Sequence, residues 1–230
     1  MTEQGADLID VGAESSRPGA AAVVSADEEL RRLLPVLRGL RDVSVPLSVD
    51  TVKPEVMRAA LAEGASMIND INALRAEGAI AVVADSAAAV CLMHMQGTPG
   101  SMQKNPSYDN VVAEVRSFLR ERVEAARAGG IAAARIVVDP GFGFGKTLEH
   151  NLELLRSLRD FNALGVPLLA GWSRKSSLGA ITGKPADARM AASIAAALIA
   201  AQNGAAILRV HDVAATRDAL LVLAAVEKTK

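Results

Sequence analysis

The sequence predicts an α/β fold in which parallel strands alternate with helices, and three observations lead to this prediction. Short apolar runs rich in β-branched residues alternate with longer stretches of helical spacing. The strand candidates are apolar almost throughout, which is typical of a parallel sheet covered by helices. Glycine recurs where a helix would stop before the next strand, as in AEGASMIND and AQNGAAILRV.

Seven strand candidates follow one another along the chain, and each is followed by a helix candidate. Some helices begin with a clear signal: Ser25 precedes an acidic first turn, and Pro54 stands where a first helical residue is expected. We expect strands at 7–12, 45–50, 66–70, 89–95, 135–139, 166–171 and 206–210. We expect helices near 25–40, 54–63, 76–86, 109–129, 148–162, 187–203 and 213–228.

The first residues, MTEQGADLIDVG, have the same form as the later junctions between a helix and a strand. Met1 therefore falls inside the expected last turn of a helix whose own strand is absent. Seven pairs plus this stub predict a (β/α)8 barrel of the TIM type that lacks its first unit, as a single domain, 1–230. An open doubly wound sheet is the alternative fold.

Composition and charge exclude several classes of protein. The 25 basic and 26 acidic side chains leave a net charge of −1, which argues against a nucleic-acid binder with a basic face. The N-terminus lacks the features of a signal peptide, and no apolar run reaches the ~18 residues of a membrane span. The single cysteine, Cys91, has apolar neighbours that suggest a buried strand position. We expect a soluble cytoplasmic protein with no nucleic-acid or membrane partner.

Polar residues stand at the ends of most strand candidates. Asp and Asn are poor strand formers, so β-propensity does not explain the set, although turn chemistry could explain any one member. In a barrel, the strand ends converge on one rim, where ligands bind. The strand-end residues are Asp10, Asp50, Asn69, Asp70, His94, Asp139, Ser173, Arg174, Lys175, Ser176, Arg209, His211 and Asp212.

Some of these groups accept hydrogen bonds and others donate them. Asp50, Asn69 and Asp139 suit a neutral heterocycle with adjacent N–H donors. A second set supplies donors that suit an anion such as a phosphate. The sequence therefore predicts a ligand with a donor-rich ring and an anionic tail. The donors are Arg17, Lys175, Arg209 and His211.

The glycine-rich run DPGFGFGKT, at 139–147, fails both nucleotide-binding patterns. A P-loop needs glycine where Pro140 stands, and the dinucleotide motif needs glycine where Lys146 stands. We interpret the run as a flexible loop whose glycines let the backbone approach a ligand, with Phe142 and Phe144 as apolar surface. A tight turn with anchoring aromatic residues is the alternative.

The three histidines share no metal-ligand spacing, and no cysteine cluster supports a zinc site, so we predict no metal held by protein groups alone. His94 lies between methionines on an apolar strand and is interpreted as a buried core residue. His211 lies two residues beyond Arg209, on the same face of a strand, and is expected to be functional.

The motifs DVGAESSRPG, SVDTVKPEV, MINDI, CLMHMQG, DPGFGFGK, GWSRKSSLG and RVHDV occur in this order over the whole chain, and together they resemble the dihydropteroate synthase family. The resemblance implies a (β/α)8 barrel and a transferase of folate biosynthesis. Such an enzyme joins 6-hydroxymethyl-7,8-dihydropterin diphosphate to p-aminobenzoate and releases pyrophosphate. Sulfonamides compete for the p-aminobenzoate site.

The resemblance also implies roles for individual residues. Asp50, Asn69 and Asp139 match positions that hold the pterin ring, and Lys175 matches a lysine that contacts both substrates. Arg209 and His211 match the diphosphate site, which binds Mg2+ together with the substrate. The residues that match the p-aminobenzoate pocket are Ser16, Arg17, Pro18, Phe144 and Ser176. The expected catalytic residues are Lys175, Asp50, Arg209 and His211.

The family begins with a strand that ends in an asparagine, which helps to bind the magnesium ion, and this sequence lacks that strand. We therefore expect a gap between the strands at 7–12 and 206–210, and reduced activity from incomplete closure. A misassigned start codon or a fragment would explain the difference, and DNA upstream of Met1 is expected to encode the missing strand.

The helix at 187–203 is small or apolar nearly all round, which predicts a homodimer contact and agrees with the resemblance. Other functions are also considered. One is a pterin-binding module without synthase activity, or one that serves methyl transfer. The others are an inactive fragment of the synthase and a sugar-phosphate barrel enzyme.

Overall fold

The computed structural model describes residues 1–15 and 24–228, and Ser16, Arg17 and Pro18 of the expected p-aminobenzoate pocket lie outside the described residues. Seven strands form one parallel sheet in the order in which they occur along the chain. All seven expected strands are therefore confirmed, each within a few residues. They are β1 Ile9–Gly12, β2 Leu47–Asp50, β3 Met67–Asp70, β4 Ala89–Met93, β5 Ile136–Asp139, β6 Leu168–Ala170 and β7 Ala205–Leu208.

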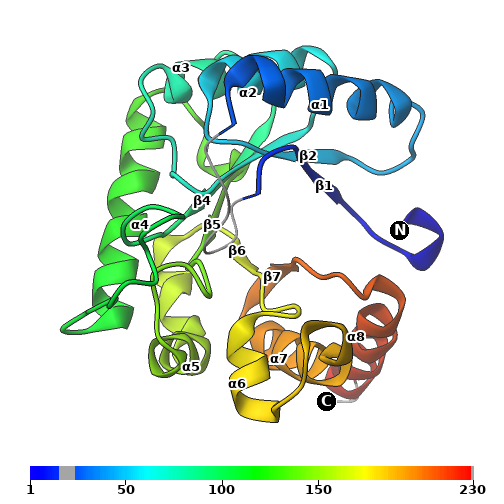
Figure 1. Cartoon of the computed structure of the whole chain (residues 1–230), viewed down its shortest axis with the longest axis vertical. Coiled ribbons are helices and arrows are strands. Elements are labelled where there is room, and N and C mark those ends of the chain that lie inside the picture. Colours follow the sequence, from blue (N-terminus) through cyan, green and yellow to red (C-terminus); the bar gives the residue numbers. More distant parts are fainter. Residues whose placement is uncertain (16–23, 229–230) are drawn as a thin grey trace.

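The sheet is curled, with its helices around the outside (Figure 1). Each strand pairs with the next in parallel, from β1 with β2 through β6 with β7, and the described strands show no pairing between β1 and β7. The order contains no reversal, so the doubly wound alternative is wrong. The fold is an incomplete barrel of the TIM type, as predicted.

Six of the seven expected helices are present near their expected positions, and the seventh, 148–162, is split after Arg156. Ser25 accepts a hydrogen bond at 3.3 Å from the Glu28 amide as the cap of the first helix, and Pro54 begins the second. Within the described residues, no helix has the length and apolar character needed to cross a membrane. The helices are α1 Ala26–Gly39, α2 Pro54–Ala62, α3 Ala79–Ala84, α4 Val111–Ala128, α5 Leu148–Arg156, α6 Ser176–Thr182, α7 Met190–Gln202 and α8 Val213–Glu227.

Short 3-10 turns complete the described chain. The turn after α5 takes up the rest of the expected long helix, and α6 is an additional helix that the sequence pattern did not predict. Thr2–Gln4 ends at Gly5, whose φ of 84° is left-handed, so the chain opens with the helix-end geometry expected there. The other 3-10 turns are Ala133–Arg135, Leu158–Leu164 and Ala186–Ala188.

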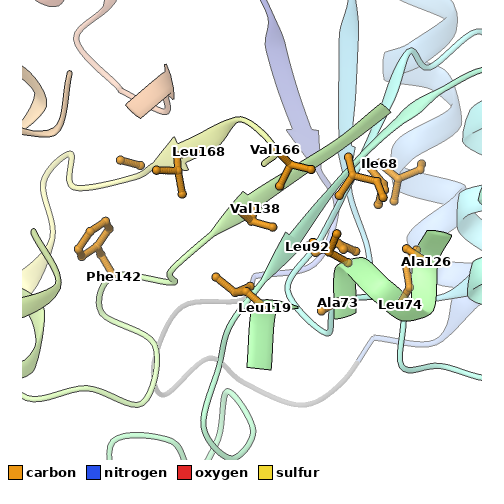
Figure 2. Close-up of a cluster of buried hydrophobic side chains, with 14 of the residues drawn as sticks. Ile68, Ala73, Leu74, Leu92, Leu119, Ala126, Val138, Phe142, Val166 and Leu168 are labelled. Carbon is orange, nitrogen blue, oxygen red and sulfur yellow. The ribbon is translucent and has the colours of Figure 1, made fainter. Parts of the chain in front are cut away.

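Alternate residues of each strand face opposite sides of the sheet. The outward set packs against the helices in the main core, where Ile68, Leu92, Val138 and Leu168 come from β3 to β6, and Leu119 comes from α4 (Figure 2).

The inward set forms a small apolar layer inside the barrel. It comprises Met67, Cys91, Val137 and Leu169. Cys91 is fully buried there, and burial raises the pKa of its thiol, which makes it unreactive. Above this layer, toward the carboxyl ends of the strands, the inward positions become polar.

Two of the leucines of α5 allow a matched test of the core. Leu154 is fully buried, whereas Leu152 is 43% exposed on the same helix. Leu154→Ala should lower the free energy of unfolding by about 2–5 kcal/mol, because it leaves a cavity. Leu152→Ala, with the same change in helix propensity, should stay within about 0.5 kcal/mol. Urea denaturation measures both, and equal losses would contradict this assignment of the core.

Candidate active site

The polar positions of the inner face meet at the carboxyl end of the sheet. In the strand register, Asp50 pairs with Gly12 on one side and with Asn69 on the other, and Asp139 pairs with Met93. Arg209 directly follows β7. The structure thus brings Asp10, Asp50, Asn69, Asp139 and Arg209 to one mouth, as the sequence predicted.

The guanidinium of Arg209 joins the two outer strands of the sheet. Its Nη2 lies 2.7 Å from Asp10 Oδ2 and 3.2 Å from Asp50 Oδ2. Asn69 Nδ2 donates to the same Asp10 oxygen at 3.3 Å. Because Asp10 lies on β1 and Arg209 follows β7, this ion pair spans the side of the barrel where the described strands are not paired. Arg209 therefore contacts the acceptor set as well as standing at the expected anion site.

Burial sets the protonation of the acceptor carboxylates. Burial, together with the neighbouring Asp10 carboxylate, raises the pKa of Asp50 to about 7, against the opposing effect of Arg209. Burial also raises the pKa of Asp139, although the Gly141 amide donates to its Oδ1 at 2.7 Å and opposes the shift. Both carboxylates are costly to keep charged here, so a ligand that donates N–H groups to them would recover part of that cost.

Lys175 lies between the glycine-rich loop and the amino end of α6. Its Nζ is 4.3 Å from the centre of the Phe144 ring, within the range of a cation–π contact. A Cβ at Gly143 would lie 3.3 Å from Lys175 Cδ, so the loop backbone runs close beside the lysine. Ser176 is the first residue of α6 and is exposed. Phe144 and Lys175 are therefore brought together, and Ser176 follows Lys175 directly in the chain.

His211 stands at the same rim, next along the chain from the Arg209 strand end. Its Nδ1 is 2.9 Å from Ser173 Oγ, and its amide donates to that oxygen at 3.1 Å. Ser173 therefore orients the imidazole, which remains exposed to solvent. Because β7 ends at Leu208, Arg209 and His211 both lie just beyond the strand, and their joint role at an anion site stays a prediction.

Other strand-end residues serve the chain's own structure. Asp70 accepts from the Asn72 and Leu74 amides, each at 2.7 Å, and so caps a turn. Asp212 pairs with Arg174, with Nη2 2.6 Å from Oδ1 and Nε 3.1 Å from Oδ2. For Asp70 the turn chemistry considered as the alternative is therefore the better description, whereas Asp212 serves an ion pair with Arg174.

The glycine-rich run is a tight turn, not the flexible loop we expected. A Cβ at Gly141 would lie 1.9 Å from the His94 carbonyl oxygen, and one at Gly145 would lie 2.6 Å from the Gln96 carbonyl oxygen. At these two glycines the backbone lies against His94 and Gln96, the residues that follow β4. Phe142 is buried in the main core beside Trp172, with ring centres 5.1 Å apart. Phe144 alone of the two aromatics reaches Lys175.

Two buried groups near the mouth were not identified from the sequence. Lys146 Nζ lies 3.0 Å from His94 Nδ1 and donates to the Gly141 and Phe144 carbonyls at 3.0 and 2.9 Å. Burial lowers the pKa of Lys146 to about 7. His94 is thus a buried core residue, as interpreted. Glu29 is fully buried and lies 2.6 Å from Lys53, which also pairs with Glu14. The sequence offered one signal for each group: Lys146 follows a run of glycines, and Glu29 places a charge on the apolar face of a helix.

One acceptor at the mouth has no partner. Asp10 Oδ1 is buried and makes no hydrogen bond in the structure. Among residues 1–15 and 24–228, no group of three or more His, Cys, Asp or Glu side chains could hold a metal ion. Mg2+ commonly takes one or two carboxylates together with substrate phosphates, so a single free carboxylate oxygen fits an ion that arrives with a phosphate ligand.

Known proteins match this chain over nearly its whole length. The family described as "Pterin binding enzyme" matches residues 1–211. A dihydropteroate synthase of Haemophilus influenzae is 49% identical over 223 residues, which are 96% of this chain and 81% of that protein.

Solved structures agree with the sequence match. The Xanthomonas albilineans dihydropteroate synthase with 4-aminobenzoic acid superimposes with a TM-score of 0.93 at 56% identity, covering 98% of this chain and 81% of the other. The Yersinia pestis enzyme in a sulfonamide drug complex superimposes with a TM-score of 0.95 at 44% identity, covering 100% and 83% of the two chains.

The raised pKa of Asp50 predicts how stability depends on pH. The folded protein holds this proton more tightly than the unfolded chain, so the contribution is full below pH 4 and is lost as pH rises through about 7. Between pH 5 and pH 8 the free energy of unfolding should fall less for Asp50→Asn, which cannot ionise, than for the wild type, and the difference should be roughly 2–3 kcal/mol. Denaturation at several pH values measures this. Asp7→Asn, which removes a 95% exposed carboxylate, is the control for lost charge, and parallel curves for Asp50→Asn and the wild type would contradict the assignment.

Proposed function

The chain belongs to the pterin-binding enzymes, among their dihydropteroate synthases, and we propose that the mouth described above is where its reaction takes place. The reaction joins 6-hydroxymethyl-7,8-dihydropterin diphosphate to p-aminobenzoate, giving 7,8-dihydropteroate and pyrophosphate. One observation carries this assignment of the site: buried acceptors, an arginine and a lysine from five strand ends gather on one inner face. We propose residues 1–230 as the single domain that performs the reaction.

The acceptor carboxylates bind the pterin ring in this proposal. Asp50 and Asp139 are buried, with raised pKa values, and Asn69 lies beside Asp50 in the strand register. The ring offers adjacent N–H groups, which a carboxylate can accept in parallel. The same carboxylates offset positive charge that spreads over the ring when the bond from its methylene carbon to the diphosphate oxygen breaks.

The donor side chains bind the leaving diphosphate. Arg209 and His211 stand at one rim. The Arg209 guanidinium also contacts Asp50, so it lies between the proposed site of the pterin ring and the proposed site of the diphosphate. Breaking the C–O bond first leaves a cationic methylene, which the p-aminobenzoate nitrogen then attacks. Arg209 and His211 stabilise the negative charge that develops on the departing group.

Mg2+ that accompanies the diphosphate belongs to this proposal. Asp10 Oδ1 is the buried oxygen available to it, and the diphosphate would provide the other charged ligands. When bound, the ion would neutralise charge on the leaving group. Arg209 keeps the other Asp10 oxygen oriented through its 2.7 Å contact.

The second substrate binds against Lys175, Phe144 and Ser176 in this proposal. The cation–π contact between Lys175 and Phe144 forms one wall, and Ser176 offers a hydroxyl at the amino end of α6. Ser16, Arg17 and Pro18 complete the pocket, although they lie outside the described residues. The Yersinia pestis relative in a sulfonamide drug complex supports the proposal that sulfonamides compete here.

We propose that the protein acts as a homodimer in the cytoplasm. Its one cysteine is buried and unpaired, which suits a reducing compartment. Helices α7 and α8 expose large apolar side chains in place of a polar outer face, which is typical of a protein contact. These residues are Met190, Ile199, Leu221, Val222 and Val226.

The dimer can be tested by sedimentation. The protein should sediment as a dimer at micromolar concentration, and Ile199→Lys, which places a charge on the exposed apolar face of α7, should shift it toward monomer. A wild-type protein that stays monomeric over the micromolar range would contradict the proposal.

Substitutions at the mouth test the proposed chemistry. Lys175→Ala and Arg209→Ala should each lower turnover at least on the order of 10²- to 10³-fold, because each removes a charge that acts on the transition state. Formation of 7,8-dihydropteroate from both substrates with Mg2+ is the measurement, and circular dichroism checks the fold. Arg41→Ala, which removes an exposed arginine paired with Glu63 away from the mouth, is the control.

Wild-type kinetics in Lys175→Ala and Arg209→Ala would remove both residues from the mechanism. Binding of the pterin substrate without product formation by the wild-type protein would favour a pterin-binding module instead.

A further inference from the structure

The turn that delivers Lys175 has an unfavourable backbone conformation. Arg174 has a φ of 58°, in the left-handed region that residues with a side chain rarely adopt. Such a conformation persists only where surrounding contacts hold it. Two contacts hold this conformation. The Arg174 side chain pairs with Asp212, and the Arg174 amide donates to Ser193 Oγ at 3.0 Å.

A third contact comes from Arg189, at the residue before α7. Its Nη1 donates to the carbonyl oxygens of Arg174 at 3.1 Å and Lys175 at 3.3 Å. Its Nε donates to the Lys184 carbonyl at 2.8 Å, beyond the other end of α6. One rigid guanidinium thus links the turn before α6 to the segment after it.

Gly179, within α6, provides the space that this guanidinium occupies. A Cβ at position 179 would lie 2.1 Å from Arg189 Nη2 and 2.5 Å from Arg189 Cζ. The clash would be with the end of a flexible side chain and not with backbone, so an alanine there would displace Arg189 while sparing the helix. Alanine is also the better helix former.

We propose that Arg189, seated over Gly179, is a positioning residue for Lys175. It holds the two carbonyls of the turn, which keeps the Lys175 side chain beside the Phe144 ring at the mouth. Arg189 acts through Lys175, so this inference rests on the role given to Lys175 in the proposed function. The alternative is a purely structural role, in which Arg189 stabilises the fold and has no separate effect on the position of Lys175.

A set of variants separates positioning from stability. Arg189→Ala and Gly179→Ala should each lower kcat/KM for p-aminobenzoate by about 10- to 100-fold, since small misplacements of a reacting group have effects of this size. The double variant should be no worse than either single variant, because both remove one contact. Gly179→Ala should keep or raise the melting temperature, which a structural role of Arg189 does not predict.

A control variant and a binding measurement complete the experiment. Arg159→Ala removes an arginine that donates to the Gln202 carbonyl at 2.7 Å, and it should leave kcat/KM unchanged. Calorimetry of p-aminobenzoate, with Mg2+ and inorganic pyrophosphate present, should show the same order of variants without relying on turnover.

The outcomes distinguish this inference from the proposed function. Unchanged kinetics and binding in Lys175→Ala would overturn the role of Lys175 itself. A large loss in Lys175→Ala, together with less than a twofold effect in both Arg189→Ala and Gly179→Ala, would overturn the positioning role alone. If the losses in kcat/KM from Arg189→Ala and Gly179→Ala multiply in the double variant, the two changes act independently. Gly179 would then not provide the space for Arg189, and the inference would also be overturned.

Discussion

The contact of Arg209 with the buried carboxylate of Asp50 and the half-buried carboxylate of Asp10 is the interaction on which the mouth depends. Asp10 and Asp50 come from neighbouring strands, and burial makes the charge of Asp50 costly. The guanidinium opposes that cost from the far end of the sheet, 2.7 Å from the Asp10 carboxylate and 3.2 Å from the Asp50 carboxylate. It therefore does two things at once: it connects the outer strands of the incomplete barrel, and it keeps the acceptor set ordered for a ligand.

Much of this arrangement could be predicted from the sequence because it depends on a simple period. Strand side chains alternate, and parallel strands end at the same edge, so Asp50, Asn69 and Asp139 had to share a face once the strands were identified. The strand order followed from the repeated units. The resemblance to a family then supplied the ligand, which composition and spacing alone described only as a donor-rich ring with an anionic tail.

The remaining features depend on contacts between distant segments, which no local pattern records. Helix α6 has seven residues and contains Gly179, so it is too short for a periodic signal and too rich in weak helix formers. Lys146 and Arg189 are ordinary charged residues in the sequence, and only the folded chain places carbonyl oxygens around them. The glycine-rich run was misjudged for the same reason, because its close neighbour, the His94 carbonyl, is 47 residues from Gly141 in the chain.

The close fit of that run limits how the protein can adapt. The backbone at Gly141 and Gly145 touches the backbone of His94 and Gln96, which follow β4. A side chain at either glycine would therefore require the end of this strand, with the buried His94, to move. Positions 141 and 145 therefore offer little freedom for substitution. Variation on this side of the mouth is left to the Phe144 ring, because there a side chain and not the main chain faces Lys175.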